Sequence, residues 1–363
     1  MFQKPLPLDY TRLDPEQTAE RISRAKTVLG SRLVILGHHY QRDEIIRWAD
    51  YRGDSYRLSQ LAAERTDAEY IVFCGVHFMA ESADILTGED QAVILPNLAA
   101  GCSMADMASI RQVEEAWCSI TGALDATRVV PVTYVNSAAS LKAFVGRNGG
   151  TCCTSSNARK ALEWALEQGE RILFFPDQHL GRNTAVAMGF DPEADMALWN
   201  PYAPMGGLDA ATLRRARILL WKGHCSVHGR FTVEQIDDAR QRFPGVRVLV
   251  HPECTLDVVR AADENGSTAY IVKAVAASPP GTTWAVGTEI NLVSRLQQEH
   301  PDKRVFCLDP VVCPCSTMYR IHPHYLLWAL ESLAAGTVVN RIEVKPEIRR
   351  WARVSLERML SIS

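Results

Sequence analysis

Short apolar runs alternate along this chain with longer segments in which apolar residues recur every three or four positions. Three of these runs lead into polar residues: 34–41 (VILGHHYQ), 130–137 (VPVTYVNS) and 248–255 (VLVHPECT). Residues 157–168 (NARKALEWALEQ) are an example of the helical spacing. Continuously apolar strands separated by helices are typical of parallel sheets covered on both faces. The pattern therefore predicts an α/β fold.

The same order of elements occurs three times along the sequence. After each of the three opening strands we predict a helix and then a second strand, at YIVFCG (70–75), TCCTSS (151–156) and TAYIVK (268–273). A third strand then leads into a segment with a distinctive cysteine: Cys102, Cys225, or the pair Cys313 and Cys315. Recurrence at domain-sized intervals indicates triplication.

We therefore expect three homologous three-layer αβα domains with parallel sheets, at residues 1–118, 119–240 and 241–363, the last with C-terminal helices. In open α/β sheets, ligands bind beyond the carboxyl ends of the strands. Three such domains around a pseudo-threefold axis would direct their strand ends, and one cysteine each, into a central active-site cavity.

Composition narrows the class of protein. The 363 residues are 47% hydrophobic and 22% charged, with a formal net charge of −3, so no basic field favours nucleic acid or an anionic membrane. No apolar stretch approaches the ~18 residues of a membrane helix, and residues 1–22 lack the pattern of a signal peptide. We expect a cytoplasmic protein.

Ten cysteines need an explanation in a cytoplasmic chain, where disulfides are rare. They could be buried structural thiols, ligands of a metal or cluster, or redox-active or nucleophilic thiols. The first interpretation suits Cys74 and Cys307 in strand-like runs and Cys118 in a helical pattern. The sequence contains no C-x-x-C pair, which argues against a zinc ribbon or a thioredoxin-type site.

Cys102, Cys225 and one cysteine of the pair Cys313 and Cys315 would converge with many polar side chains at the strand ends. Three thiolates around one axis suit a cuboidal iron–sulfur cluster in which one iron has no protein ligand and can act as a Lewis acid. Proton transfer could come from histidine, tyrosine and carboxylate groups. This combination indicates dehydration or condensation chemistry. The side chains in question are His38, His39, Tyr40, Tyr134, Asn136, His228, His251 and Glu253.

Ten motifs, in order and over nearly the whole chain, resemble those of the quinolinate synthase family. They are HHYQRDEI with ADYRGDS, CGVHFMAESADIL, AGCSMADM, YVNSAASLKA, CCTSSNA, PDQHLGRNTA, HCSVH, HPEC, GSTAYI and VGTE. The resemblance implies three homologous α/β domains around a central 4Fe-4S cluster. It also implies NAD biosynthesis: iminoaspartate, made by aspartate oxidase, is condensed with dihydroxyacetone phosphate to quinolinate, with loss of phosphate and water. A transient contact with aspartate oxidase is a further expectation.

The resemblance also implies which cysteines hold the cluster. They are Cys102, Cys225 and Cys315, the last because Cys315 and Met318 reproduce the family's C-x-x-M pattern. Cys313 would match only in a shifted frame, so we expect it to lie near the cluster or to form a disulfide under oxidation.

Other residues carry over from the family's motifs in the same way. Glu253 is the expected general base, with Tyr40 as an acid/base beside it and His38 also in the catalytic group. The substrate-binding residues are expected to be His38, Ser55, Tyr134, Asn136, Ser155, His228, His251, Glu253 and Thr268. The histidines would hold phosphate or carboxylate oxygens, and Ser55, Asn136, Ser155 and Thr268 would bind the two carboxylates.

Simpler interpretations stand beside these. A Tyr-x-Asn after a strand is usually turn chemistry, and the polar residues before 157–168 and around Ser55 could merely cap helices. Two other functions compete: a cluster- or zinc-dependent hydro-lyase or aldolase acting on another small acid, and a redox sensor using Cys313 and Cys315. The first would need different anion-binding residues, and the second would leave the polar strand ends without a purpose.

Overall fold

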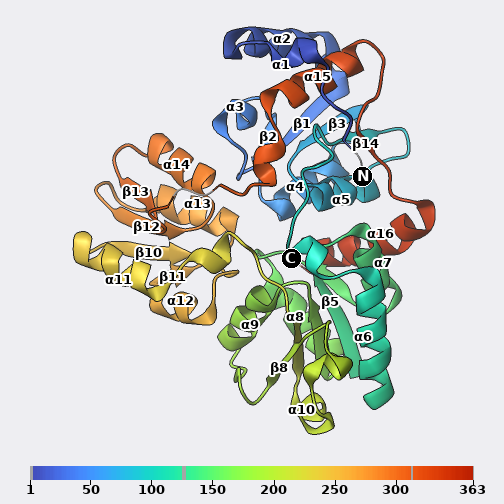
Figure 1. Cartoon of the computed structure of the whole chain (residues 1–363), viewed down its shortest axis with the longest axis vertical. Coiled ribbons are helices and arrows are strands. Elements are labelled where there is room, and N and C mark those ends of the chain that lie inside the picture. Colours follow the sequence, from blue (N-terminus) through green and yellow to red (C-terminus); the bar gives the residue numbers. More distant parts are fainter. Residues whose placement is uncertain (1–2, 125–127, 312–313, 363) are drawn as a thin grey trace. The chain divides into compact units, whose positions relative to one another are not determined.

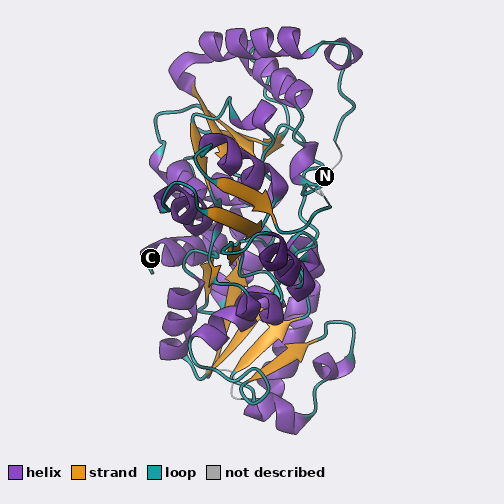
Figure 2. Cartoon of the chain, turned by 90° about the vertical axis from the view of Figure 1, so that its left-hand side faces the viewer, coloured by secondary structure: helices purple, strands orange, loops and turns teal. Residues whose placement is uncertain are grey.

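A computed structural model of the chain describes residues 3–124, 128–311 and 314–362. The chain divides into two compact units. The first unit contains residues 1–102 and 313–345, and the second unit contains residues 103–312 and 346–363. In both units the strands are flanked by helices on both faces, as Figure 2 shows.

The first unit is built on one sheet with the strand order β14-β4-β3-β1-β2. All neighbours are parallel except β14, which pairs antiparallel with β4. β1 is buried along its whole length, as its uninterrupted apolar sequence predicts. The strands are β1 (Leu33–His38), β2 (Tyr51–Gly53), β3 (Tyr70–Cys74), β4 (Ala92–Ile94) and β14 (Arg341–Ile342).

Helices of the first unit begin at clear capping residues. Asp14 and Gln17 form a capping box at the start of α2, and Asp54 accepts a hydrogen bond from the backbone of Arg57 at the start of α4. α15 lies beside α2 (Figure 1), and Arg21 binds Glu331 across this contact. The helices are α1 (Leu8–Thr11), α2 (Pro15–Leu29), α3 (Asp43–Ile46), α4 (Ser55–Glu64), α5 (His77–Leu86) and α15 (Pro323–Ala334).

The second unit contains two parallel sheets, with the orders β6-β5-β7-β9-β8 and β11-β10-β12-β13. The first is formed by β5 (Val129–Tyr134), β6 (Thr151–Cys153), β7 (Arg171–Phe175), β8 (Met196–Trp199) and β9 (Ile218–Trp221). The second is formed by β10 (Arg247–Val250), β11 (Glu264–Asn265), β12 (Thr283–Gly287) and β13 (Arg304–Cys307). Phe175 packs edge-on against both Phe144 and Trp221 in the core of the first of these sheets.

The helices of the second unit mostly follow strands, as the βα repeat predicts. They are α6 (Ile110–Ala123), α7 (Ala139–Arg147), α8 (Ala158–Gln168), α9 (Gln178–Ala187), α10 (Ala210–Arg215), α11 (Val233–Arg242), α12 (Leu256–Ala261), α13 (Thr268–Ala277), α14 (Ile290–Glu299) and α16 (Pro346–Ser361). α16 packs on α7, although the two are far apart in the sequence. No helix of the described chain is both long and apolar enough to cross a membrane.

The predicted α/β class is confirmed, with three mostly parallel sheets among the described residues. The boundaries 1–118, 119–240 and 241–363, the pseudo-threefold axis and the central cavity stay predictions. The strand predicted at 268–273 is wrong: these residues begin α13. Ser267 caps this helix by accepting from the backbone of Tyr270, and Ile271 and Val275 are buried on one face. The short β11 takes the strand position instead.

Candidate functional site

Glu253 lies in the turn that follows β10, at the carboxyl end of that strand. The backbone N–H of Glu253 donates to the ring Nδ1 of His251, at 3.3 Å. The backbone N–H of Cys254 donates to the carbonyl of His251, at 3.0 Å. The residue Glu253 is only 3% exposed, so this tight turn places a carboxyl group inside the second unit.

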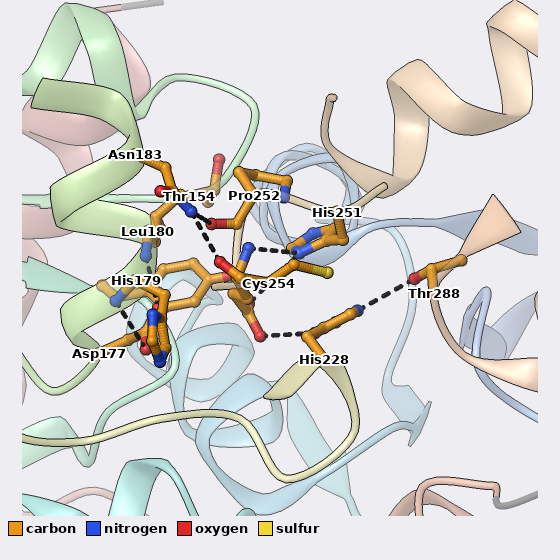
Figure 3. A network of polar contacts seen from close by, with 12 residues as sticks. Thr154, Asp177, His179, Leu180, Asn183, His228, His251, Pro252, Cys254 and Thr288 are labelled. Atoms are coloured by element: carbon orange, nitrogen blue, oxygen red, sulfur yellow. Dashed lines mark hydrogen bonds and ion pairs between the residues drawn. The ribbon is translucent and has the colours of Figure 1, made fainter. Parts of the chain in front are cut away.

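Both carboxyl oxygens of Glu253 have partners from elsewhere in the second unit. The hydroxyl of Tyr134, the last residue of β5, donates to Oε1 at 2.6 Å. Nδ1 of His228 lies 2.8 Å from Oε2. Nε2 of His228 lies 3.1 Å from the hydroxyl oxygen of Thr288, a contact that is drawn in Figure 3. The carboxyl group is therefore fixed between two donors.

The rings of His228 and His251 are stacked, with centroids 4.2 Å apart and planes 16° from parallel. Burial, and then the charge of His228, lower the pKa of His251 to about 3, so His251 is neutral near neutral pH. Its Nδ1 can then accept the backbone N–H of Glu253, as the geometry requires.

Glu253 is held as a carboxylate. Burial pushes its pKa upward, but the two histidines and the hydrogen bonds from His228 and Tyr134 together outweigh burial, and the pKa lies below its ordinary value. Asp177 shows the opposite outcome: burial, and then the charge of Glu253, raise the pKa of Asp177. A buried, oriented carboxylate of this kind can act as a general base.

Cys225 belongs to the same group of side chains. One ligand atom from each of Cys225, His228 and Glu253 lies within 4.8 Å of the others, close enough to hold a metal ion. Cys225 is partly exposed, whereas His228 and Glu253 are buried. Sulfur, nitrogen and oxygen ligands of these types suit zinc, and a thiolate also suits an iron–sulfur cluster.

Three further predicted residues of the second unit lie close to strand or helix ends. Asn136 follows β5, and its Oδ1 is buried without a hydrogen-bond partner among residues 3–124, 128–311 and 314–362. Thr268 is the buried first residue of α13, and Ser155 is a partly exposed residue between β6 and α8. Asn157 is the N-cap residue of α8, but its side chain makes no cap hydrogen bond there.

In the first unit, His38, Tyr40 and Ser55 also lie at strand and helix ends. His38 is the buried last residue of β1, and its Nδ1 accepts the backbone N–H of Tyr40 at 3.1 Å. The two rings pack edge-on with centroids 4.7 Å apart. Ser55 is the first residue of α4, where Asp54 forms the cap.

Cys102 and Cys315 are both partly exposed residues of the first unit. The segment that follows Cys315 is tied to the rest of this unit by side chain to backbone bonds. Nε2 of Gln41 donates to the carbonyl of Met318 at 3.2 Å, and Nδ2 of Asn97 donates to the carbonyl of Arg320 at 2.9 Å. Arg320 in turn donates to the carbonyl of Ala99, near Cys102. Cys313 lies outside the described residues.

Several other thiols suit a structural role rather than metal binding. Burial raises the pKa of Cys74 to about 12 and that of Cys152 to about 11, and raises those of Cys153 and Cys254 as well. Because a ligand must be a thiolate, these buried thiols are poor candidates. Cys118 is exposed on α6, so the packing role predicted for it is wrong. Cys102, Cys225 and Cys315 combine exposure with positions on loops, which suits cluster ligands.

Two residues that contact this site were not singled out from the sequence. Thr288 lies within the VGTE motif and faces His228, and Asn183 lies within PDQHLGRNTA and contacts the turn of Glu253. Their presence in quoted motifs was the only available signal, because nothing in the local pattern indicates which distant element each would meet.

Comparisons with known proteins agree with the motifs. A family model described as quinolinate synthetase A protein matches residues 20–361. The chain is 59% identical to the quinolinate synthase of Corynebacterium glutamicum over 360 residues, covering 99% of this chain and 91% of that protein. It is 54% identical to the quinolinate synthase of Geobacillus thermodenitrificans over 362 residues, covering 99% and 97%. The quinolinate synthase of Streptomyces coelicolor is 59% identical over 352 residues, covering 96% and 89%.

Proposed function

The chain belongs to the quinolinate synthetase A family, and from this premise we propose that it condenses iminoaspartate with dihydroxyacetone phosphate to form quinolinate, releasing phosphate and water. Both substrates are small anions, and the product is a pyridine dicarboxylate that feeds NAD biosynthesis. The observation that carries the proposal is the buried Glu253 carboxylate, fixed by Tyr134 and His228.

Glu253 would remove protons from carbon or nitrogen in the steps that lead to the aromatic ring. Its carboxylate is ionised, buried and oriented, which are the conditions under which a general base acts without first reorganising water. Tyr134 and His228 hold it and can each return or share a proton. Tyr40 and His38, at the end of β1, are proposed to complete the acid/base group.

The carboxylates of iminoaspartate and the phosphate of dihydroxyacetone phosphate need positively charged or N–H-bearing partners. Ser55 and Thr268 are the first residues of α4 and α13, where backbone N–H groups and the helix dipole favour anions. Asn136 and Ser155 would add side-chain hydrogen bonds, and His228 and His251 imidazole contacts. Because an ionised carboxylate only accepts hydrogen bonds, Asn136 would bind it through the Nδ2 donor of its amide.

A 4Fe-4S cluster is proposed on Cys102, Cys225 and Cys315, with Cys313 outside the ligand set. When bound, a cluster of this type supplies an open iron that acts as a Lewis acid on the group to be dehydrated. The chain's own residues provide the thiolates and place Cys225 beside the Glu253 carboxylate. Supply of iminoaspartate by a transient contact with aspartate oxidase, and a cytoplasmic location, stay predictions.

A second candidate is a zinc-dependent hydro-lyase or aldolase acting on another small acid. It is favoured by one observation, the mixed Cys225, His228 and Glu253 donor set, which resembles a catalytic zinc site more than a cluster site.

Metal analysis on protein purified without oxygen distinguishes the two candidates. We expect about four iron and four acid-labile sulfide per chain, together with quinolinate formation from the two proposed substrates. One zinc per chain without sulfide, in a well-folded sample that forms no quinolinate, would support the second candidate instead.

A further inference from the structure

We propose that Asn183, on α9, is a positioning residue that fixes the backbone on both sides of Glu253 and so keeps the carboxylate in its reactive place. The inference rests on the proposed function in one respect, the role of Glu253 as general base. Asn183 itself is assigned no contact with substrate.

Asn183 bridges the carbonyl groups of the two residues that flank Glu253. Its Nδ2 donates to the carbonyl of Pro252 at 2.8 Å and to the carbonyl of Cys254 at 2.8 Å. Figure 3 shows the amide pointing at this turn from the neighbouring helix. An amide nitrogen carries two hydrogens, so both are used on the carbonyls that flank the carboxylate-bearing residue.

The orientation of this amide has one solution. Both groups that it faces are hydrogen-bond acceptors, so only the nitrogen can face them. The Oδ1 atom is buried and has no hydrogen-bond partner among residues 3–124, 128–311 and 314–362. The side chain is 5% exposed, so water does not easily replace it. Both amide hydrogens of Asn183 are thus used on the turn, while its carbonyl oxygen stays unsatisfied.

The helix that carries Asn183 is itself held firmly. Asp177 caps α9 by accepting from the backbone N–H groups of His179 at 3.2 Å and Leu180 at 2.7 Å. Gly181 lies against the sheet so closely that a Cβ atom there would be 2.7 Å from the side chains of Phe174 and Leu220. α9 is therefore held in a fixed position against the sheet, and Asn183 in turn holds the turn of Glu253 in place.

If the turn moved, the hydrogen bonds of the Glu253 carboxylate would lengthen. The Glu253 carboxylate meets Tyr134 at 2.6 Å and His228 at 2.8 Å. A backbone shift that lengthened these contacts by an ångström would misplace the base, and a misplacement of that size costs about a hundredfold in rate. We expect substrate binding to change much less, because Asn183 donates to the turn and the other proposed substrate-binding residues keep their positions.

Asn183→Ala tests this, with Gln91→Ala as a matched control. Nε2 of Gln91 donates to the carbonyls of Arg65 at 2.7 Å and Ala68 at 2.6 Å, and Gln91 is 7% exposed. Gln91 belongs to the first unit, whereas Glu253 belongs to the second. Both variants lose an amide that bridges two carbonyls. Because Oε1 of Gln91 also accepts the backbone N–H of Gly88 at 3.0 Å, Gln91→Ala should lower Tm at least as much as Asn183→Ala.

We expect kcat for quinolinate formation to fall about a hundredfold in Asn183→Ala, with KM changed by less than about threefold. In Gln91→Ala both should stay at wild-type values. Asn183→Ser, which keeps one donor in a smaller side chain, should lie between wild type and Asn183→Ala. If Asn183→Ala does not fold, the serine variant carries the same test.

The proposal is overturned if the Asn183 variants lose no more turnover than Gln91→Ala, or if KM rises while kcat is unchanged. Glu253→Gln, assayed alongside, separates this from a failure of the proposed function. Full turnover in Glu253→Gln would show that Glu253 is not the general base. The positioning role of Asn183 would then have no basis. An inactive Glu253→Gln beside fully active Asn183 variants would refute the positioning role alone.

Discussion

Glu253 keeps its negative charge although it is buried, because His228, His251 and Tyr134 stabilise the ionised form. Burial favours the neutral form of a carboxyl group, and it is the largest cause of the raised pKa of Asp177. Two nearby carboxyl groups thus have pKa values that move in opposite directions. Such separation is characteristic of acid/base sites and is consistent with the role proposed for Glu253.

Thr288→Val should lower kcat, because it replaces the hydroxyl that faces Nε2 of His228 with a methyl group of similar size. Loss of a partner at a buried polar atom costs about 1–3 kcal/mol, or roughly fivefold to 160-fold in rate if the cost falls on the transition state. Steady-state kinetics checks this, with Thr288→Ser as the control that retains the hydroxyl. Equal turnover in the valine variant would show that the Thr288 hydroxyl is dispensable.

The packing of α7 against α16 joins the last helix of the chain to the strand end that bears Tyr134. A Cβ atom on Gly146 of α7 would lie 2.0 Å from the backbone carbonyl of Trp351 on α16. Ser355 of α16 also donates to the carbonyl of Lys142 at 2.8 Å. The two helices approach closely only because position 146 has no side chain.

Gly146→Ala should therefore destabilise the second unit by at least about 2 kcal/mol, because a methyl group cannot fit against a backbone carbonyl. Gly122→Ala is the matched control, since a Cβ there meets nothing within 4 Å on α6. The control should leave the free energy of unfolding unchanged or raise it by up to about 1 kcal/mol. Urea unfolding measures both, and an unchanged Gly146→Ala would contradict the close contact.

Across the whole molecule, the proposed cluster ligands come from both compact units. Cys102 and Cys315 belong to the first unit, where Asn97, Gln41 and Arg320 tie the neighbouring segments together. Cys225 belongs to the second unit, beside His228 and Glu253. The metal content can therefore be tested at the cysteines of each unit in turn.

Single alanine variants of Cys102, Cys225 and Cys315 should each lose the cluster, because each would remove one of three thiolate ligands. Cys313→Ala should keep it, as should Cys118→Ala, a control at an exposed position on α6. Iron and sulfide per chain, measured without oxygen, check the outcome. Loss of iron in Cys313→Ala but not in Cys315→Ala would reverse the assignment.

Local pattern was sufficient to predict the α/β class and the strands that end at His38, Tyr134 and just before His251, because uninterrupted apolar runs are characteristic of buried parallel strands. It also identified His228 and Glu253, which the structure brings into contact. It failed at 268–273, where an apolar run was taken for a strand. Short apolar runs suit either element, and here the cap at Ser267 favours the helix.

Only the tertiary structure could reveal the roles of Asn183 and Thr288. Each meets a partner that is distant in the sequence, the turn around Glu253 for Asn183 and the ring of His228 for Thr288. Hydrophobic periodicity describes how one segment faces the core, but it contains no information about which other segment packs there. Those pairings are decided by the docking of whole helices and strands, such as the close seat of α9 on its sheet at Gly181.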